Sequence, residues 1–184
     1  ECKQLPFQYP ERTLKYLAPY LSRTNITPYV EQFARQVASQ AKWDTVPFLT
    51  ELSARIYGDF VYQVREEGMA FSPEETLLSR SGSCRDFALL FMAACRCLGI
   101  ASRFVSGYLF GNPLQAHELH AWVGVYLPGA GWRGFDPTEG QAMINNHIAM
   151  GASADHQQLA PVMGTFRGQA VAQMHTEVSI REAE

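Results

Sequence analysis

The segment from Cys84 to Leu98 constrains the fold more than any other, because its side chains are apolar on nearly every side. One face of an α-helix over this segment, at about 100° per residue, would carry Cys84, Phe87, Ala88, Phe91, Cys95 and Leu98. Leu89, Leu90, Ala93 and Cys97 would cover much of the opposite side, and only Arg85 and Arg96 mark a polar stripe. Since a helix that is apolar nearly all round is surrounded by protein, we predict a buried central helix that begins after Gly82 and ends at Gly99.

Helix starts are recognisable before this segment. Thr27 followed by Pro28 combines a capping residue with proline at the first helical position. Asp44 is predicted to cap the next helix, which has apolar residues at helical spacing. Ser72 and Glu75 have the spacing of a capping box. We therefore predict three helices ahead of the central one.

Strands are predicted after Gly99. Four segments are rich in β-branched and aromatic residues and are separated by turn residues: ASRFVSGYLF, LHAWVGVYLP, GWRGFDP and AQMHTEVSIR. A chain with helices first and strands second is typical of an α+β fold with a mainly antiparallel sheet.

Composition indicates one folded domain over residues 1–184. Hydrophobic residues make up 47% of the chain, enough for a sizeable core. The formal net charge is −3 and the Lys and Arg residues form no block, so we expect no nucleic-acid partner. The longest apolar run, FALLFMAAC, is far shorter than the ~20 residues that span a bilayer, so no membrane segment is expected.

The N-terminal region and the cysteine content add two further expectations. The chain begins with Glu1 rather than Met, and we expect it to be a fragment of a longer protein or an already processed one. Residues 1–27 contain prolines among aromatic residues and are predicted to form an extended segment on the surface. Four cysteines are too few for a disulfide scaffold in a chain of this length, so a reducing, cytoplasmic location is expected.

The positions of the thiols separate them by function. Cys95 and Cys97 diverge by ~200° on a helix, which prevents them from binding one metal ion together, and both are predicted to be core residues. Cys84 lies ~16 Å from Cys95 along the axis, too far for a disulfide. Because Cys84 falls in the first helical turn, the helix dipole favours its thiolate, and its backbone amide could bind a developing oxyanion. The alternative is that Cys84 is only a small residue at a helix start.

A thiolate nucleophile needs a base and a residue that orients the base. His120 begins a predicted strand in which Trp122 and Gly124 share its face, away from an apolar face. Asp136 ends the next strand, so a hairpin would bring its carboxylate to His120 and hold the imidazole in one tautomer. Alternatively, His120 is a half-buried sheet residue and Asp136 a turn residue. His117 falls in a loop and is expected to be solvated.

Five motifs occur here in one order: a Gly-x-Cys-x-Asp helix start, a Leu-Gly-Ile exit, a Gly-Tyr strand, a His-Ala-Trp strand and a Gly-Trp…Asp-Pro-Thr strand. This arrangement, over residues 70–181, resembles the transglutaminase-like superfamily in its bacterial, cysteine-peptidase-like branch. HIAMG and PVMGTFRG resemble the tail of that bacterial subgroup. The resemblance implies a papain-like fold in which the Cys helix packs on an antiparallel sheet. It also implies that Cys84 is the nucleophile, His120 the base and Asp136 the orienting residue.

The chain departs from the family pattern at two positions. Gly124 stands where the family usually has Glu, and Ala101 stands where it often has Pro. The first departure removes a carboxylate from the neighbourhood of the site and leaves the three catalytic positions unchanged.

Secondary roles are predicted for three residues near the site. Asp86 matches the family's Asp and is interpreted as structural, since a carboxylate is favoured at a helix N-terminus. Trp122 is a candidate for shielding the site from water, although large aromatic residues are more often core. Tyr108 either lines the cleft or sits at the edge of the core. Tyr62 and Trp43 are weak candidates for a second oxyanion donor.

Together, these residues and the family resemblance predict an α+β, papain-like enzyme that transfers acyl groups from amide bonds of a peptide or protein through a thioester. The alternative is a catalytically silent scaffold of the same fold that binds a protein or ligand. A metal site is disfavoured because the thiols are wrongly spaced, and neither a cofactor nor a metal is expected.

Overall fold

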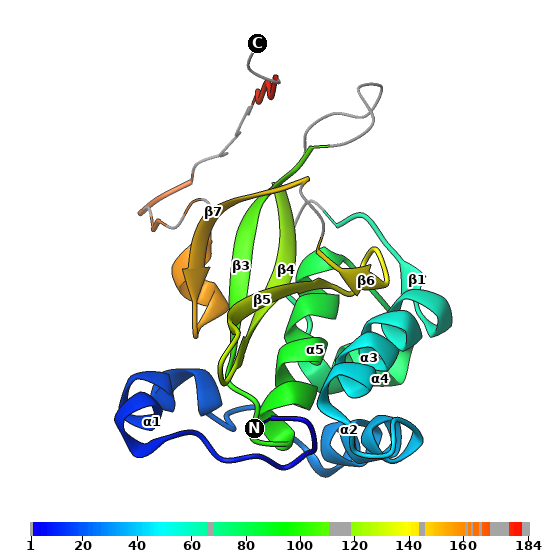
Figure 1. Cartoon of the computed structure of the whole chain (residues 1–184). Coiled ribbons are helices and arrows are strands. Elements are labelled where there is room, and N and C mark those ends of the chain that lie inside the picture. Colours follow the sequence, from blue (N-terminus) through cyan, green and yellow to red (C-terminus); the bar gives the residue numbers. More distant parts are fainter. Residues whose placement is uncertain are drawn as a thin grey trace.

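The computed structural model describes residues 2–65, 68–110, 119–143, 146–160, 162, 164–165, 167–169 and 177–181. Helices precede a five-stranded antiparallel sheet with the strand order β6-β5-β4-β3-β7 (Figure 1). The predicted α+β class with a C-terminal antiparallel sheet is confirmed.

The helices and strands have the following bounds. The helical elements are α1 (Glu11–Leu17), the 3-10 turn η1 (Ala18–Leu21), α2 (Pro28–Gln40), α3 (Thr45–Asp59), α4 (Pro73–Ser79), α5 (Cys84–Cys97) and the 3-10 turn η2 (His156–Leu159). The main strands are β3 (Ser102–Leu109), β4 (Leu119–Leu127), β5 (Gly131–Asp136), β6 (Gln141–Ala142) and β7 (His147–Ser153). β1 (Val61–Tyr62) and β2 (Ser81–Gly82) form a separate parallel pair.

The predicted helix starts are present in the structure. The Thr27 side chain accepts a hydrogen bond from the Val30 amide at the start of α2. At the start of α4, Ser72 accepts from the Glu75 amide at 3.2 Å and donates its own amide to Glu75 Oε2 at 2.8 Å, which completes the capping box. Asp44 is the N-cap residue of α3, but its side chain makes no capping hydrogen bond.

The helix α5 is the centre of the molecule, as its sequence predicted. Ten of its 14 residues are buried, and it lies between the sheet and the helices α2, α3 and α4 (Figure 1). Phe91 stacks on Phe135 of β5 with ring centroids 5.8 Å apart, while Phe87 packs edge-on against Phe60 at 6.0 Å. The helix therefore has apolar partners on both the sheet side and the helical side.

The expectation of an extended segment over residues 1–27 is wrong for residues 11–21. Pro10 takes the N-cap position and the chain then forms α1 and η1. Leu17 is the buried residue of α1, and the other residues of the helix are exposed or only partly buried. The prolines were read as signs of extended chain, but proline is also compatible with the first turn of a helix.

The part of this segment before α1 is anchored on the sheet by Tyr9. Its hydroxyl accepts a hydrogen bond from the Ala101 amide and donates to the Tyr126 carbonyl, both at 2.9 Å. Burial raises the pKa of Tyr9 to about 12, so the hydroxyl keeps the proton that it donates. The N-terminal segment is thereby held where β3 and β4 meet.

Three of the four predicted strands match β3, β4 and β5. The fourth, AQMHTEVSIR, lies partly outside the described residues, and its described part, residues 177–181, forms no strand. The sheet instead gains β7, which pairs with β3 and was not predicted as a strand. Its sequence, HIAMGAS, contains small residues and one Ile, and this composition gives a weak strand signal.

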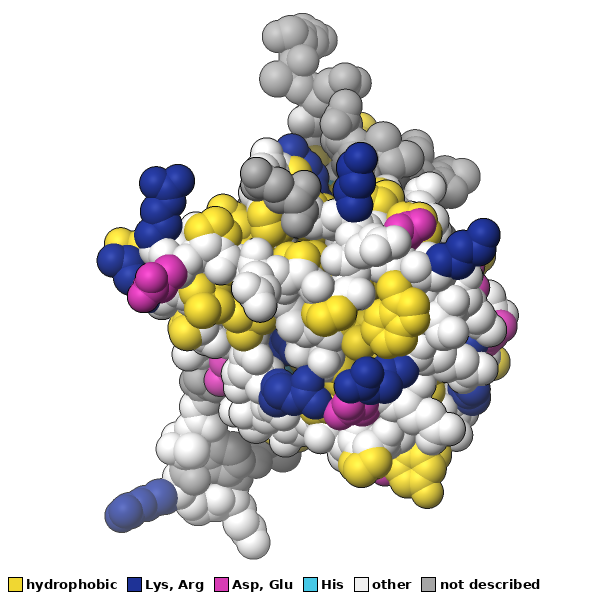
Figure 2. Space-filling view, turned by 60° about the horizontal axis from the view of Figure 1, so that its bottom comes forward, with side chains coloured by type: hydrophobic (Ala, Val, Ile, Leu, Met, Phe, Trp, Pro, Cys, Tyr) yellow, Lys and Arg dark blue, Asp and Glu magenta, His cyan; other side chains and the backbone are white. Residues whose placement is uncertain are grey.

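The surface carries charges of both signs. Figure 2 shows hydrophobic side chains in scattered patches between Lys or Arg side chains and a few acidic ones. In the described part of the chain, no helix is both long enough and apolar enough to cross a membrane.

We expect Cys95→Ser to destabilise the protein. Cys95 is fully buried in α5, and a hydroxyl there would lose its hydration without gaining an evident partner, at a cost of about 1–3 kcal/mol. Urea unfolding measures the change. Cys2→Ser is the matched control, because Cys2 is only partly buried; equal unfolding midpoints for the two variants would contradict the core assignment of Cys95.

Candidate active site

The site is organised by the carboxylate of Asp136, at the end of β5, which is fully buried. Its Oδ1 accepts hydrogen bonds from the amides of Thr138 at 2.9 Å and Glu139 at 3.4 Å. Its Oδ2 accepts from Nε2 of His120 at 2.7 Å and from Nε2 of His147 at 2.8 Å. Burial by itself would raise the pKa of Asp136, but the hydrogen bonds from the two imidazoles hold it well below its usual range. Asp136 is therefore an ionised group inside the protein.

His120 is the second residue of β4, and its ring meets Asp136 as the sequence predicted. The β4–β5 hairpin pairs Val123 with Phe135, which brings the end of β5 beside the start of β4. Burial would lower the pKa of His120, but the hydrogen bonds to Asp136 and Cys84 and the charges of both groups raise it to about 10. The imidazole is thus stabilised in its protonated form.

Cys84 is the first residue of α5, and its thiol lies near enough to the His120 imidazole to help raise the pKa of that ring. Since Nε2 of His120 faces Asp136, Nδ1 is the nitrogen left for the thiol. Burial raises the pKa of Cys95 well above its ordinary value and that of Cys97 to about 11. The structure therefore brings Cys84, His120 and Asp136 together and keeps these two thiols in the core. The catalytic roles of the three residues stay predictions.

His147 belongs to the same cluster, and the sequence analysis did not identify it as a site residue. It is the first residue of β7, and its side chain is 3% exposed. Its Nδ1 lies 2.8 Å from Oδ1 of Asn146, and its ring packs edge-on against Trp122 at 5.0 Å. Residues 144–145, which precede Asn146, lie outside the described part. The one available signal was the HIAMG motif, which pointed to the family but assigned no role to the histidine.

Asp86 holds the start of α5 in place. Its carboxylate is fully buried and accepts from the Ser83 amide and hydroxyl, both at 2.8 Å, and from the Phe71 amide at 2.7 Å. Arg65 adds an ion pair at 2.9 Å, and its guanidinium also bonds the Met69 carbonyl and lies over the Phe71 ring. A Cβ at Gly82 would come within 2.8 Å of Asp86 Cβ, so this approach requires glycine. These contacts agree with the structural interpretation of Asp86.

The remaining predicted residues lie around the cluster. Trp122 is 2% exposed and stacks beside His120 at 6.1 Å. Tyr108 is half-buried in β3, between Leu119 of β4 and Ile148 of β7. Tyr62 of β1 pairs with Gly82, two residues before Cys84. His117 lies outside the described residues.

The departure at Gly124 has a visible structural consequence. Gly124 pairs with Arg103 across β4 and β3, and a Cβ there would come within 2.9 Å of the Arg103 Nε. The guanidinium of Arg103 instead lies over the Trp132 ring, 4.2 Å from its centroid, while its buried Nε has no hydrogen-bond partner among the described residues. The space that a Glu side chain would need at this position is occupied by the arginine itself.

Within the described residues, one group has donor atoms close enough to hold a metal ion: His120, Asp136 and His147, whose ligand atoms all lie within 4.8 Å of one another. However, the N–O separations of 2.7 and 2.8 Å are those of hydrogen bonds. A zinc ion about 2.0–2.2 Å from each donor would hold neighbouring N and O atoms roughly 3 Å apart or more. The arrangement as it stands therefore suits protons between these atoms.

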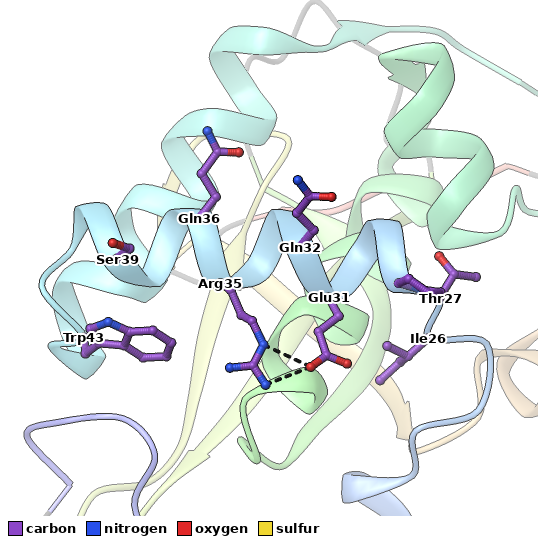
Figure 3. Close-up of a pocket in the computed structure, with 9 residues that line it drawn as sticks. Ile26, Thr27, Glu31, Gln32, Arg35, Gln36, Ser39 and Trp43 are labelled. Carbon is purple, nitrogen blue, oxygen red and sulfur yellow. Dashed lines mark hydrogen bonds and ion pairs between the residues drawn. The ribbon is translucent and has the colours of Figure 1, made fainter.

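A separate groove of about 730 Å³ runs along α2 (Figure 3). It is lined by residues between Ile26 and Ser39 and by Trp43, and the ion pair of Glu31 with Arg35 crosses its wall. Cys84, His120 and Asp136 do not line this groove. The weak candidate Trp43 thus belongs to a different surface from the catalytic candidates.

Comparison with known families agrees with this geometry. The model of the family described as the transglutaminase-like superfamily matches residues 31–137, a range that includes all three catalytic candidates. The chain belongs to the transglutaminase-like superfamily. The match begins within α2, well before the sequence motifs, and ends before β7.

Individual relatives give a similar result. An uncharacterized protein of Mycobacterium tuberculosis (strain ATCC 25618 / H37Rv) is 33% identical over 155 residues, which cover 78% of this chain and 49% of the relative. The chain thus spans about half the length of the curated relatives it matches first. A protein-glutamine gamma-glutamyltransferase of Pseudomonas aeruginosa is 34% identical over 92 residues, covering 45% of this chain and 14% of that protein.

A solved structure supports the papain-like, transglutaminase-like fold. The crystal structure of a candidate cysteine protease from Cytophaga hutchinsonii superposes with a TM-score of 0.68 at 24% identity, covering 87% of this chain and 53% of that one. At this level of identity the similarity shows the fold.

We expect Asp86→Ala to destabilise the fold strongly, by about 3–5 kcal/mol, because it leaves the Arg65 guanidinium and the amides of Ser83 and Phe71 without their acceptor. Urea unfolding tests this. The control is Glu75→Ala, which removes an exposed capping carboxylate and should destabilise the fold much less. Similar losses in the two variants would contradict the structural role of Asp86.

Stability should also depend on pH through His120. Its pKa is raised in the folded state to about 10, whereas an unfolded histidine titrates near 6.5. The stabilisation is therefore fully present below about pH 6.5 and is lost as the pH rises through the folded pKa. To remove the thiol from the titration, we would compare Cys84→Ala with Cys84→Ala/His120→Gln. The difference in their free energies of unfolding should shrink as the pH rises above 6.5, because Asp136 still raises the pKa of His120 in the first variant, and a constant difference would refute the pairing.

Proposed function

We propose that this chain transfers acyl groups from amide bonds through a thioester on Cys84. One observation carries the proposal: the buried Asp136 carboxylate lies 2.7 Å from Nε2 of His120, and the Cys84 thiol lies near the same imidazole ring. A thiol, an imidazole and a carboxylate linked in this order are the parts that nucleophilic catalysis requires. Membership of a superfamily with a named transglutaminase among the relatives supports the same reaction class.

The first half of the reaction forms the acyl-enzyme. The Cys84 thiolate attacks the carbonyl carbon, and the negative charge moves to the carbonyl oxygen. Helix amides of the first turn of α5 lack intrahelical acceptors, so the Cys84 amide is placed by its position to stabilise that oxygen. The C–N bond then breaks, the His120 imidazolium gives its proton to the leaving nitrogen, and a thioester remains.

The second half regenerates the enzyme. The neutral imidazole takes a proton from water or from an amine, which attacks the thioester, and the thiolate leaves as His120 is protonated again. Water yields a carboxylic acid, and an amine yields a new amide. Asp136 stays ionised throughout and supports the imidazolium, while the hydrogen bond fixes the tautomer that presents Nδ1 to the sulfur.

We infer the substrate class from this chemistry together with the named relatives. The acyl donor is an amide of a peptide or protein, either in the backbone or in a glutamine side chain. The relative from Pseudomonas aeruginosa is named for the second of these. Both reactions use the same steps and differ only in which amide is the acyl donor and whether water or an amine is the acceptor.

We expect iodoacetamide at limiting dose to label Cys84 before the other thiols below pH 7. A position at a helix start and beside a histidine is typical of reactive cysteines, whereas burial protects Cys95 and Cys97. Cys2 is the internal control, as a partly buried thiol remote from the imidazoles in sequence. Peptide mass spectrometry measures the labelling order. Labelling of Cys84 no faster than Cys2 would overturn the activated nucleophile.

Cys84→Ala separates the enzyme from a binding scaffold. The variant should lose hydrolysis and amine incorporation on a panel of peptide and glutamine amides. Its thermal stability should change only slightly, by about 1 kcal/mol or less. Turnover that survives this substitution would exclude the thioester route. If the wild type lacks turnover on every substrate and Cys84 is not preferentially labelled, the scaffold is the better assignment.

A further inference from the structure

His147 has an unusual set of contacts for a residue without an assigned role. It enters the site from β7, while His120 comes from β4 and Asp136 from β5. Two imidazoles from different strands thus donate to one oxygen, Oδ2 of Asp136, at 2.7 and 2.8 Å. The His147 side chain is 3% exposed and that of Asp136 is completely buried, so water does not readily replace this donor.

The His147 ring is itself fixed on two sides. Oδ1 of Asn146 lies 2.8 Å from its Nδ1, which leaves Nε2 directed at Asp136. The edge-on contact with Trp122, at an interplanar angle of 74°, restricts rotation of the ring. Trp122 also stacks beside His120, so the two imidazoles are held against one indole. A ring constrained in this way suits the placement of another group.

We propose that His147 is a positioning residue, whose Nε2–H holds the Asp136 carboxylate in the orientation that directs Oδ2 at His120. The backbone amides of Thr138 and Glu139 fix Oδ1, and His147 supplies the corresponding restraint on Oδ2. Without it, Oδ2 would have His120 as its one remaining donor among those described, and the carboxylate could turn. The role of His147 in thiol activation rests on the proposed function, because it acts through Asp136 and His120.

The same contact has an electrostatic consequence. The titratable groups of the described residues that face Asp136 are His120 from β4 and His147 from β7, and the Cys84 thiol of α5 lies beyond His120. Burial favours the neutral form of Asp136, and the two imidazole hydrogen bonds oppose it. Removing His147 therefore raises the pKa of Asp136, and thiol activation should be lost at a higher pH than in the wild type.

Two substitutions distinguish positioning from simple packing. His147→Phe keeps an aromatic ring against Trp122 but removes the donor. His147→Gln keeps an N–H at a similar reach but loses the ring. If His147 only fills space, Phe should be the better replacement; if it positions Asp136, Gln should be.

The experiment measures the rate of iodoacetamide labelling at Cys84 between pH 4 and 9 in the full chain, with Cys2 as the internal reference and thermal melts for each variant. His147→Phe should slow labelling at pH 7 by about 10-fold or more, as expected for loss of a hydrogen bond to a charged group. It should also move the acid limb, the pH range in which the labelling rate falls as the pH is lowered, to higher pH. His147→Gln should stay within roughly 3-fold of the wild type, because it retains that donor. An unchanged rate and acid limb in a folded Phe variant, or equal losses in both folded variants, would overturn the proposal.

Two further measurements cover the other outcomes. If His147→Phe does not fold, Asn146→Ala replaces it, because it releases Nδ1 of His147, and should shift the acid limb in the same direction. The ¹⁵N NMR signals of the His120 ring report the bond to Asp136 whether or not the thiol is activated. A wild-type Cys84 no more reactive than Cys2 would refute the proposed function. If Cys84 is not activated, the NMR measurement still tests His147. An unchanged His120 Nε2–H signal in His147→Phe would refute the role of His147, and loss of that signal would support it.

Discussion

The apolar surface that surrounds α5 is the constraint on which the rest of the structure depends. A helix with ten buried residues needs cover on every side, and the sheet and the helices α2 to α4 provide it (Figure 1). Its N-terminus is where polar groups gather, because the first amides of a helix need acceptors that the helix itself cannot supply. Cys84 and Asp86 lie in this first turn, so the most buried element of the fold also presents the candidate nucleophile.

Two buried aspartates have different roles because their hydrogen-bond partners differ. Asp86 is held by an arginine, two amides and a hydroxyl. Arginine is not a proton donor or acceptor in catalysis, so this network has a structural role. Asp136 is held by two amides and two imidazoles. Imidazoles do exchange protons, and the second carboxylate is therefore coupled to a group that can change its charge during a reaction.

Sequence patterns predicted the elements whose signals are local. The capping box of Ser72 and Glu75 depends on residues three apart, and the burial of α5 follows from its own periodicity. His120 and Asp136 could be paired because a short hairpin joins their strands. In each case, the residues that decide the structure are close in sequence.

Other features depended on contacts between distant segments. β7 pairs with β3, about forty residues earlier in the sequence, and its own residues are poor strand formers. His147 was therefore not placed on the sheet, and its approach to Asp136 could not be inferred. The helix α1 was missed for a related reason, since its prolines were taken as signs of extended chain and the buried Leu17 has no local signal.

The position of β7 also affects where the boundary of the domain should be drawn. The family match ends at residue 137, yet β7 covers one side of β3 along most of its length. A fragment cut at the limits of the match would leave β3 with unpaired N–H and C=O groups along a strand rich in apolar residues, a form of edge that promotes aggregation. Recombinant fragments of this domain should therefore extend past Ser153. Poor solubility of a shorter fragment would be explained by the missing strand β7 rather than by an unstable fold.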